Sequence, residues 1–391
     1  MNVAPADEPG IAAAIAAAHA AREPLLVEGR GTKRAMLRPV QAARTLSTRH
    51  HTGITLHSPS ELIISARAGT PILEIEAKLA EAGQYLIAEP PDFSALLGAG
   101  PPTLGGVVAA NLSGPRRIAW GAMRDHVMGV RFVNGTGEIL RSGGRVLKNV
   151  TGLDLCKLLA GSNGTLGVMT EITLKVLPAP QASGTLVLSG LSIAPGVAAL
   201  SAALGSPYGI SGATWLPAEA AARAPELPPG PCALIRIEDF TPSVAYRLGR
   251  LREIFGGDIL DDAASRALWR RIRDAELLPA TADDGIWRVS VRPSAAPALL
   301  AALPDLHVFL DWGGGLAWIA GAATAATHAT VAAAARATRG SWTLFRGPEP
   351  LRAAVDVVPS EPEPLARISR RVKAAMDPAG ILNPGRVYAG L

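Results

Sequence analysis

The sequence contains little cysteine and few aromatic residues, and each scarcity argues against a class of protein. Its two cysteines, Cys156 and Cys232, lie far apart and form no CxxC pair, which argues against zinc or iron–sulfur ligation within this chain. Two free thiols fit a reducing cytoplasm. Aromatic residues make up 4% of the chain and no basic stripe interleaves with them, so we expect no nucleic-acid partner.

Histidine is sparse as well, and its positions match no set of metal ligands. His50 and His51 are adjacent, and neighbouring positions cannot share one face of a helix or strand. His307 and His328 have no acidic or histidine partner at ligand spacing. We therefore predict no metal site, and no constellation typical of a general base identifies catalytic residues.

Long apolar runs are missing, with one ambiguous exception. Residues 316–335 contain His328 as their only ionisable group, and such a stretch is long enough to span a bilayer. Because its bulk is Ala, Thr and Gly, a strand (LAWIAGA) followed by a helix explains it better. The N-terminus lacks a basic region and carries early acids, so we do not expect a signal peptide.

What the chain does contain is enough apolar sequence for more than one core. It has 391 residues, of which 48% are hydrophobic and 18% charged, and this length favours two domains. The net charge of +5 comes from 38 basic residues, of which only six are lysine; a bias towards arginine and alanine in the coding sequence explains it. The composition of the sequence changes near Pro178–Pro180, and we place the boundary between the two domains there.

The local patterns predict a mixture of helices and strands. In the first half we expect helices over Ile11–Ala21 and Ile72–Ala82, strands over Leu25–Val27, Ser60–Ala68 and Val168–Leu177, and a hairpin whose strands, Val127–Val133 and Glu138–Arg141, flank Asn134–Gly137. In the second half we expect strands over Ala233–Ile237, Trp287–Val291 and His307–Trp312 and a helix over Ser243–Phe255.

Two glycine-rich segments are the most informative feature of the chain. They are Thr103–Gly121 (TLGGVVAANLSGPRRIAWG) and Gly161–Val168 (GSNGTLGV), each beside apolar, strand-like sequence. Glycine allows close approach of the backbone and positive φ angles, so such loops present many peptide N–H donors to a negative ligand. The diphosphate of a dinucleotide is the ligand we expect, because its negative oxygens can accept hydrogen bonds from many such N–H groups.

Several segments, in this order, resemble the vanillyl-alcohol-oxidase (PCMH) type of FAD-linked oxidases. They are GRGTK, ARAGTPILEIEAKLAEAGQYLIAEPP, TLGGVVAANLSGPRRIAWGAMRDHV, VLKNVTGLDLCKLLAGSNGTLGVMTEITLKVLP and MDPAGILNPGR. Within that family, the chain is most similar to the FAD-binding subunits of bacterial glycolate oxidase (glycolate dehydrogenase) complexes. The resemblance implies an α+β fold, with a FAD-binding domain of two α+β subdomains over 1–180, an α+β cap and partner-docking domain over 181–360, and a C-terminal segment over 361–391 that returns to the FAD domain.

The resemblance also implies which residues contact FAD. They are Gly29, Arg30, Gly31, Thr32 and Lys33 in the first phosphate loop; Pro90 and Pro91 near the flavin ring; Thr103, Leu104, Gly105, Gly106, Ala109, Asn111, Ser113 and Gly114 in the second loop; Gly121 and Asp125 in the next turn; Gly161, Gly164, Thr165, Gly167 and Val168 near the adenosine half; and Asn383 at the C-terminal return. The chain departs from the pattern at Glu28 and Arg30, where relatives usually have glycine, and at Asn163, where many have an acid.

Some basic residues near these loops have two interpretations. Arg116 and Arg117 are either surface charges or neighbours of the diphosphate. Lys148 is either solvated or placed to stabilise reduced flavin near its N1–C2 carbonyl. Cys156 is expected to be a small core residue.

The chain lacks one segment that the resemblance associates with catalysis. Catalytic relatives carry a histidine-rich segment that takes the hydroxyl proton of a 2-hydroxy acid, whereas the equivalent region here, LFRGPEPLRAAVDVVPSEPEP, has no histidine. The resemblance therefore implies a FAD subunit that carries electrons from glycolate oxidation to glyoxylate and is inactive alone. It implies non-covalent FAD as well, because Thr32 stands where related enzymes that tether flavin often have histidine. Its partners would be a homologous FAD-containing catalytic subunit and an iron–sulfur subunit, in the cytoplasm and peripheral to the inner membrane. Two alternatives stay open: a self-sufficient FAD enzyme for another small alcohol or sugar, and a structural subunit that binds flavin weakly or not at all.

Overall fold

The computed structural model describes residues 2–144 and 153–390 and divides the chain into two units. Unit 1 comprises Met1–Ser113, Ala122–Ala179 and Ser360–Leu391, and unit 2 comprises Gly114–Gly121 and Pro180–Pro359. The chain therefore leaves unit 1 for eight residues, 114–121, in the middle of the second glycine-rich segment. The sequence did not predict this excursion. Lys148 lies outside the described residues.

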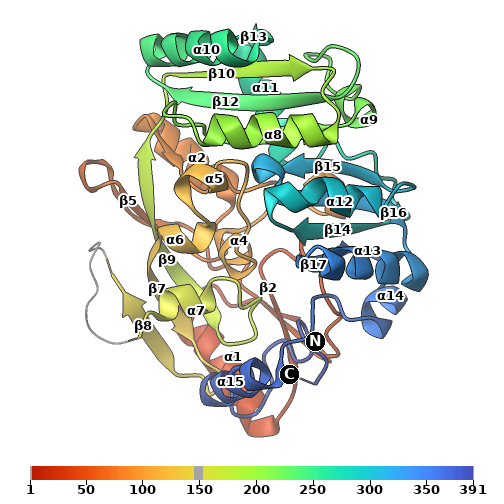
Figure 1. The fold of residues 1–391 in the computed structure, drawn as a ribbon. Helices are drawn as coiled ribbons and strands as arrows, with labels where there is room; N and C mark the ends of the chain where they lie inside the picture. Colours follow the sequence, from red (N-terminus) through yellow and green to blue (C-terminus); the bar gives the residue numbers. More distant parts are fainter. Residues whose placement is uncertain (1, 145–152, 391) are drawn as a thin grey trace. The chain divides into compact units, whose positions relative to one another are not determined.

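The described residues of unit 1 form two sheets, and Figure 1 labels β2 of the first sheet and β5, β7, β8 and β9 of the second. The first has three parallel strands in the order β1-β3-β2, and the second is antiparallel in the order β4-β5-β9-β7-β8, with β6 pairing with β9. The strands are β1 (Asn2–Val3), β2 (Leu25–Glu28), β3 (Arg44–Ser47), β4 (Ile54–Ser58), β5 (Ile63–Arg67), β6 (Gln84–Leu86), β7 (Val127–Val133), β8 (Ile139–Gly143) and β9 (Val168–Pro178).

The helices of unit 1 begin with α1, whose sequence sets both its start and its buried face. Asp7 caps it by accepting a hydrogen bond from the amide of Gly10 at 2.8 Å, and Ile11, Ile15 and Ala18 recur at helical spacing and are buried. These residues pack with Leu25 and Leu382 in one apolar cluster. The helices are α1 (Glu8–Ala21), α2 (Ile72–Glu81), α3 (Ser94–Leu97), α4 (Leu104–Ala109), α6 (Met123–His126), α7 (Leu155–Leu159) and α15 (Glu363–Met376).

Unit 2 is built on one eight-stranded antiparallel sheet in the order β13-β10-β12-β11-β15-β16-β14-β17. Its strands are β10 (Ala182–Ser189), β11 (Gly212–Leu216), β12 (Cys232–Asp239), β13 (Asp258–Leu260), β14 (Asp284–Ser290), β15 (His307–Asp311), β16 (Leu316–Ala322) and β17 (Ser341–Arg346). Its helices are α5 (Arg117–Trp120), α8 (Ile193–Leu204), α9 (Ala218–Ala221), α10 (Thr241–Phe255), α11 (Asp262–Arg273), α12 (Ala296–Ala301), α13 (Ala325–Ala337) and α14 (Glu349–Ala354). Helices α10 and α11 pack on β10, α8 packs on β11 and β12, and α13 packs on β14 and β17.

Most predicted elements are confirmed, and one strand needs correction. The stretch 316–335 is strand β16 followed by helix α13, as its composition predicts. The strand predicted over Ser60–Ala68 instead begins at Ile63, because Pro59–Glu61 forms a 3-10 turn and Leu62 has a positive φ of 56°. Among the described residues, no helix has the length and hydropathy that crossing a membrane requires.

Candidate functional site

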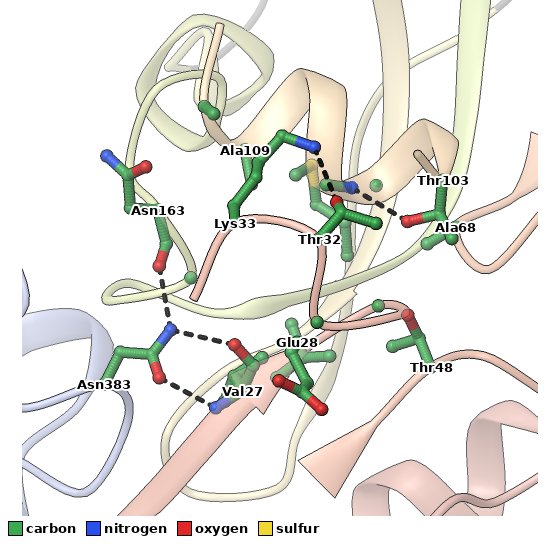
Figure 2. A pocket seen from close by; sticks show the side chains of 18 of the residues that line it. Val27, Glu28, Thr32, Lys33, Thr48, Ala68, Thr103, Ala109, Asn163 and Asn383 are labelled. Carbon is green, nitrogen blue, oxygen red and sulfur yellow. Dashed lines mark hydrogen bonds between the residues drawn. The ribbon is translucent and has the colours of Figure 1, made fainter. Parts of the chain in front are cut away.

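The candidate site is a pocket in unit 1 lined mainly by four segments distant in sequence, with Thr48 and Ala68 beside them (Figure 2). The loop after β2 forms one wall, α4 forms another, and the loop before β9 and the C-terminal segment complete it. It is lined by Leu26, Val27, Glu28, Gly29, Arg30, Gly31, Thr32, Lys33, Arg34, Thr48, Ala68, Thr103, Gly105, Gly106, Ala109, Ala110, Asn163, Gly164, Gly167, Val168, Met169, Asn383 and Arg386.

The loop after β2 presents backbone donors that the rest of the described chain does not use. Gly31 has a φ of 74°, a left-handed conformation that bends the loop. Within the part of the chain that the structure describes, the amides of Gly31, Thr32 and Lys33 donate no hydrogen bond. Unsatisfied N–H groups on a tight turn that lines a pocket form a concavity suited to an anion.

The acid in this loop is neutralised within the loop. Both oxygens of Glu28 accept hydrogen bonds from Arg34, at 2.6 Å from Nε and 2.7 Å from Nη2. In this bidentate pair the guanidinium of Arg34 balances the negative charge of the Glu28 carboxylate. Glu28 therefore adds little unbalanced negative charge beside the pocket.

Lys33 supplies a positive charge beside the same loop. Its Nζ contacts Thr32 Oγ1 at 3.3 Å, and a Cβ added at Gly106 would lie 3.4 Å from that Nζ. Burial lowers the pKa of Lys33 to about 8, and the charge of Asp92 partly opposes this shift. An anion bound next to the unused amides would stabilise the charged form of Lys33 and raise its pKa again.

Close packing at two glycines explains why the pocket walls need bare backbone. A Cβ at Gly29 would lie 2.3 Å from Thr103 Oγ1, so the first loop sits directly against the start of α4. A Cβ at Gly105 would lie 2.8 Å from the Ala68 Cβ and 3.0 Å from the Ala68 carbonyl oxygen. Thr103 caps α4 by accepting from the amide of Gly106 at 3.3 Å.

Asn383 holds two of the pocket's segments together (Figure 2). The amide of Val27 donates to Asn383 Oδ1 at 2.7 Å, and Asn383 Nδ2 donates to the carbonyl of Val27 at 3.1 Å and to that of Asn163 at 2.8 Å. The side-chain amide of Asn383 thus forms its hydrogen bonds with other residues of the protein. Its place at the pocket is therefore that of a clamp between β2 and the loop before β9.

Many of the residues singled out in the sequence line this one pocket. They are Gly29, Arg30, Gly31, Thr32, Lys33, Thr103, Gly105, Gly106, Ala109, Gly164, Gly167, Val168 and Asn383. The others do not line it: Pro90, Pro91, Leu104, Asn111, Ser113, Gly114, Gly121, Asp125, Gly161 and Thr165. Leu104 is a core residue, with 1% of its surface exposed, and Gly114 and Gly121 belong to unit 2.

Three of these outlying residues close the base of the 114–121 excursion. The amide of Arg124 donates to Asn111 Oδ1 at 2.9 Å, and the amide of Met123 donates to Ser113 Oγ at 2.8 Å. Asp125 Oδ2 accepts from the amide of Ala122 at 2.8 Å. Their side chains thus fix where the chain leaves unit 1 and where it returns.

The sequence analysis missed Arg386, which lines the pocket from the C-terminal segment. Its Nη1 donates to the carbonyl of Arg38 at 2.8 Å and its Nη2 to that of Lys33 at 2.6 Å. It therefore ties the end of the chain to the first loop. The signal that pointed to it was its position two residues after Pro384 in the motif that returns the chain to this domain.

Comparison with known proteins places this chain in a family. The family described as "FAD binding domain" matches residues 1–143. The chain is 37% identical over 376 residues to glycolate oxidase subunit GlcE of Escherichia coli (strain K12), covering 95% of this chain and 94% of that protein. It is 32% identical over 167 residues to glycolate oxidase subunit GlcD of Bacillus subtilis (strain 168), covering 42% of this chain and 34% of that one.

Solved structures agree on the fold. Alkyldihydroxyacetonephosphate synthase superposes with a TM-score of 0.70 at 18% identity, covering 98% of this chain and 75% of that chain. The 4-ethylphenol oxidase of Gulosibacter chungangensis superposes with a TM-score of 0.72 at 13% identity, covering 99% of this chain and 88% of that chain.

The fold is thus the α+β fold of the PCMH and vanillyl-alcohol-oxidase type of FAD-linked oxidoreductases. Within that class, the chain belongs to the family of the glycolate oxidase subunit GlcE.

Proposed function

We propose that this chain is the FAD-binding subunit of a glycolate-oxidising complex. The observation that carries the proposal is the pocket in unit 1, where the unused amides of Gly31, Thr32 and Lys33 and the Lys33 ammonium converge. A dinucleotide diphosphate carries the negative oxygens that such a group of donors satisfies. When bound, FAD supplies an acceptor for hydride or electrons.

Different segments of the chain would contact different parts of FAD. The loop 29–33 and residues 103–106 would bind the diphosphate, with Ala109, Asn111, Ser113 and Gly114 along the second loop. The loop 161–168 would lie near the adenosine half, Pro90 and Pro91 near the flavin ring, and Gly121 and Asp125 in the adjoining turn. Leu104 and Asn383 would support these segments by packing and by hydrogen bonds.

We propose that FAD is held without a covalent bond. Enzymes that tether flavin often use a histidine in the first glycine loop, where this chain has Thr32. The residues lining the pocket include neither histidine nor cysteine, so the pocket offers no imidazole or thiol for a tether.

The chain would act with partners, because the region in which the resemblance places a histidine base for glycolate oxidation has no histidine here. The relatives GlcE and GlcD are both named as glycolate oxidase subunits. We propose a homologous FAD-containing catalytic subunit and an iron–sulfur subunit as partners, with electrons passing through this chain's FAD. The complex would be cytoplasmic and peripheral to the inner membrane.

Turnover with glycolate and an artificial electron acceptor tests the proposal. The purified chain should show almost none alone, and the complex rebuilt from all its subunits should turn over. A complex lacking only this chain serves as the control and should be inactive. Turnover of about 1 to 10³ per second by the chain alone would contradict the subunit proposal and favour a self-sufficient enzyme.

A further inference from the structure

Helix α15 is attached to unit 1 by a polar side chain rather than by an apolar face. Of its fourteen residues only Lys373 is buried, and the ammonium of Lys373 forms hydrogen bonds to Asp377 and to two backbone carbonyls. On one flank of the helix, Arg370 and Ala374 line an open groove of about 740 Å³. Helices in proteins owe most of their stability to the packing of an amphipathic face, and α15 makes little use of its own apolar face within unit 1.

The large apolar side chains of α15 form a stripe on its solvent-facing side. Leu365, Ile368 and Val372 follow one another at spacings of three and four residues, which places them on one face of the helix. Leu365 is 53% exposed and Ile368 56% exposed, and Val372 is half-buried. Scattered exposed apolar residues are ordinary, but residues at this spacing are the anchors by which an amphipathic helix enters an apolar groove. We call these three residues the outer stripe.

Two arginines lie beside the outer stripe without an acid to balance them. Arg367 and Arg371 are exposed, and neither forms a hydrogen bond or an ion pair with any residue that the structure describes. They lie four positions apart on the helix, where like charges repel each other. Arg370, by contrast, is paired with Glu363 at 2.5 Å. A surface that covers the outer stripe and carries carboxylates at its edge would therefore offset two unbalanced charges.

The residue types of α15 favour a protein groove over a membrane surface or a second copy. Helices that lie in a membrane interface carry Lys and Arg on one face and Trp, Phe or Leu on the other. Helix α15 has no aromatic residue, and its one lysine, Lys373, is buried. Arginine is enriched in protein interfaces and lysine is depleted there. Pairing α15 with the same helix of a second copy would bring Arg367 and Arg371 close to the same two cations, which is unfavourable.

We propose that the outer stripe of α15, with Arg367 and Arg371 beside it, docks into an apolar groove edged by carboxylates on another subunit of the complex. The outer stripe would supply the contacts from which water is excluded. The two arginines would steer association and fix the partner's orientation. The surface itself rests on the geometry of α15. That the groove belongs to a subunit of a glycolate-oxidising complex rests on the proposed function.

The affinity of the full-length, FAD-loaded chain for the remaining subunits of the complex, purified together without it, tests this surface by biolayer interferometry. A variant with Leu365→Ser and Ile368→Ser should have a Kd about 10- to 100-fold higher, because it loses two apolar anchors. A variant with Arg367→Glu and Arg371→Glu should also bind more weakly. Added NaCl should weaken binding of the wild type, and this salt effect should be lost in the variant with reversed charges.

Two matched control variants change the same kinds of residue elsewhere. Leu73→Ser alters an apolar residue on α2 that is 58% exposed. Arg252→Glu alters an exposed arginine of α10 that has no ion pair with a described residue. Both controls should keep the Kd of the wild type. A thermal melt and the FAD content show that each variant is folded, and the variant with reversed charges keeps the test informative if the apolar one is not.

An unchanged Kd in both α15 variants, or an equal loss in the controls, would overturn the inference. Retention of the wild type on phosphatidylglycerol vesicles that both α15 variants abolish would assign the outer stripe to a membrane instead. A wild-type dimer that these variants dissociate would assign it to a second copy. A complex that assembles through α15 without oxidising glycolate would contradict the proposed function and leave the docking surface standing, whereas a wild type that does not bind these subunits would contradict both.

Discussion

At the scale of single residues, one ion pair and three backbone amides determine how well the candidate FAD pocket suits an anion. Glu28 and Arg30 stand where the resemblance to FAD-linked oxidases implies glycine. In the structure Glu28 pairs with Arg34 and the amides of Gly31, Thr32 and Lys33 remain unused. The sequence identified the loop, but the ion pair depends on how the loop folds back, which a linear pattern does not give.

Replacing Lys33 with methionine should weaken FAD binding while leaving the fold intact. The change keeps the length of the side chain and removes the one ammonium beside the unused amides. We expect about a 10- to 100-fold increase in Kd, the effect of losing a charge-assisted contact. Fluorescence titration of the apoprotein with FAD measures it. Lys78→Met, which removes an exposed lysine paired with Glu81 on α2, is the control.

The pKa of Lys33 predicts a pH dependence of FAD affinity. In the free pocket this pKa is lowered to about 8, and a bound diphosphate would raise it by favouring the charged form. Affinity should therefore be flat below pH 8 and fall above it, by up to about tenfold per pH unit. Titrations from pH 6.5 to 9.5 test this. Lys33→Met should remove the fall, and an equal fall in that variant would exclude Lys33 as its source.

Gly106→Asp should abolish FAD binding with little loss of stability. A Cβ here would meet only Thr103 Oγ1 at 3.2 Å and Lys33 Nζ at 3.4 Å, the ends of side chains that can move. A carboxylate about 4 Å from the diphosphate costs roughly 4 kcal/mol at an effective dielectric of about 20, or about three decades of affinity. Absorbance at 450 nm and a thermal melt check both parts. Gly105 is unsuitable because a side chain there would strike the Ala68 backbone.

The control for this charge is Gly249→Asp. Gly249 lies in α10 of unit 2, and nothing lies within 4 Å of an added Cβ. This variant should bind FAD normally. Normal FAD content in a folded Gly106→Asp protein would show that residues 103–106, at the start of α4, are not the diphosphate site.

At the scale of elements, the end of α15 returns the C-terminus to the pocket. Lys373 donates from Nζ to the carbonyls of Thr165 and Leu382 and to Asp377 Oδ2, each at 2.8 Å. Asp377 in turn accepts from the amides of Ile381 at 3.1 Å and Leu382 at 2.8 Å. This network fixes the segment that carries Asn383 and Arg386.

Asp377→Ala should destabilise unit 1 strongly. It leaves the buried ammonium of Lys373 without its carboxylate, a change that typically costs about 3 to 5 kcal/mol. Urea unfolding followed by circular dichroism measures the loss. Glu363→Ala is the matched control, because it removes an exposed partner of Arg370 on the same helix and should change stability by less than about 1 kcal/mol. Equal losses in the two variants would show that the Lys373–Asp377 network does not anchor the C-terminus.

The same scale shows what sequence patterns can and cannot predict. Local sequence patterns located α1, α2, α10 and the β7–β8 hairpin, because each of these elements depends on residues close in sequence. The start of β5 was predicted three residues too early, since the turn Pro59–Glu61 ends at Leu62 in a left-handed conformation that a leucine does not signal in the sequence. The hydrogen bonds of Asn383 and Arg386 join residues hundreds of positions apart; the motif around Pro384 indicates the segment, but no local signal gives its bonding partners.

At the scale of the whole molecule, the chain crosses between its two units within one glycine-rich segment. The resemblance to FAD-linked oxidases assigned that segment to the cofactor, yet residues 114–121 group with unit 2. Asn111, Ser113 and Asp125 close the base of the excursion in unit 1, and Arg116 and Arg117 are anchored in unit 2. One continuous loop is therefore tied to the cofactor unit at its base and to the second unit at its tip.

The most direct test of the account is the identity of the cofactor that the purified chain releases. Acid precipitation should leave the yellow colour in the supernatant, and chromatography should identify it as FAD in a ratio near one per chain. This result is expected because the pocket offers a diphosphate cradle and no histidine or cysteine for a tether. FMN or NAD in the supernatant, colour retained in the pellet, or a colourless chain that takes up no added FAD would contradict it.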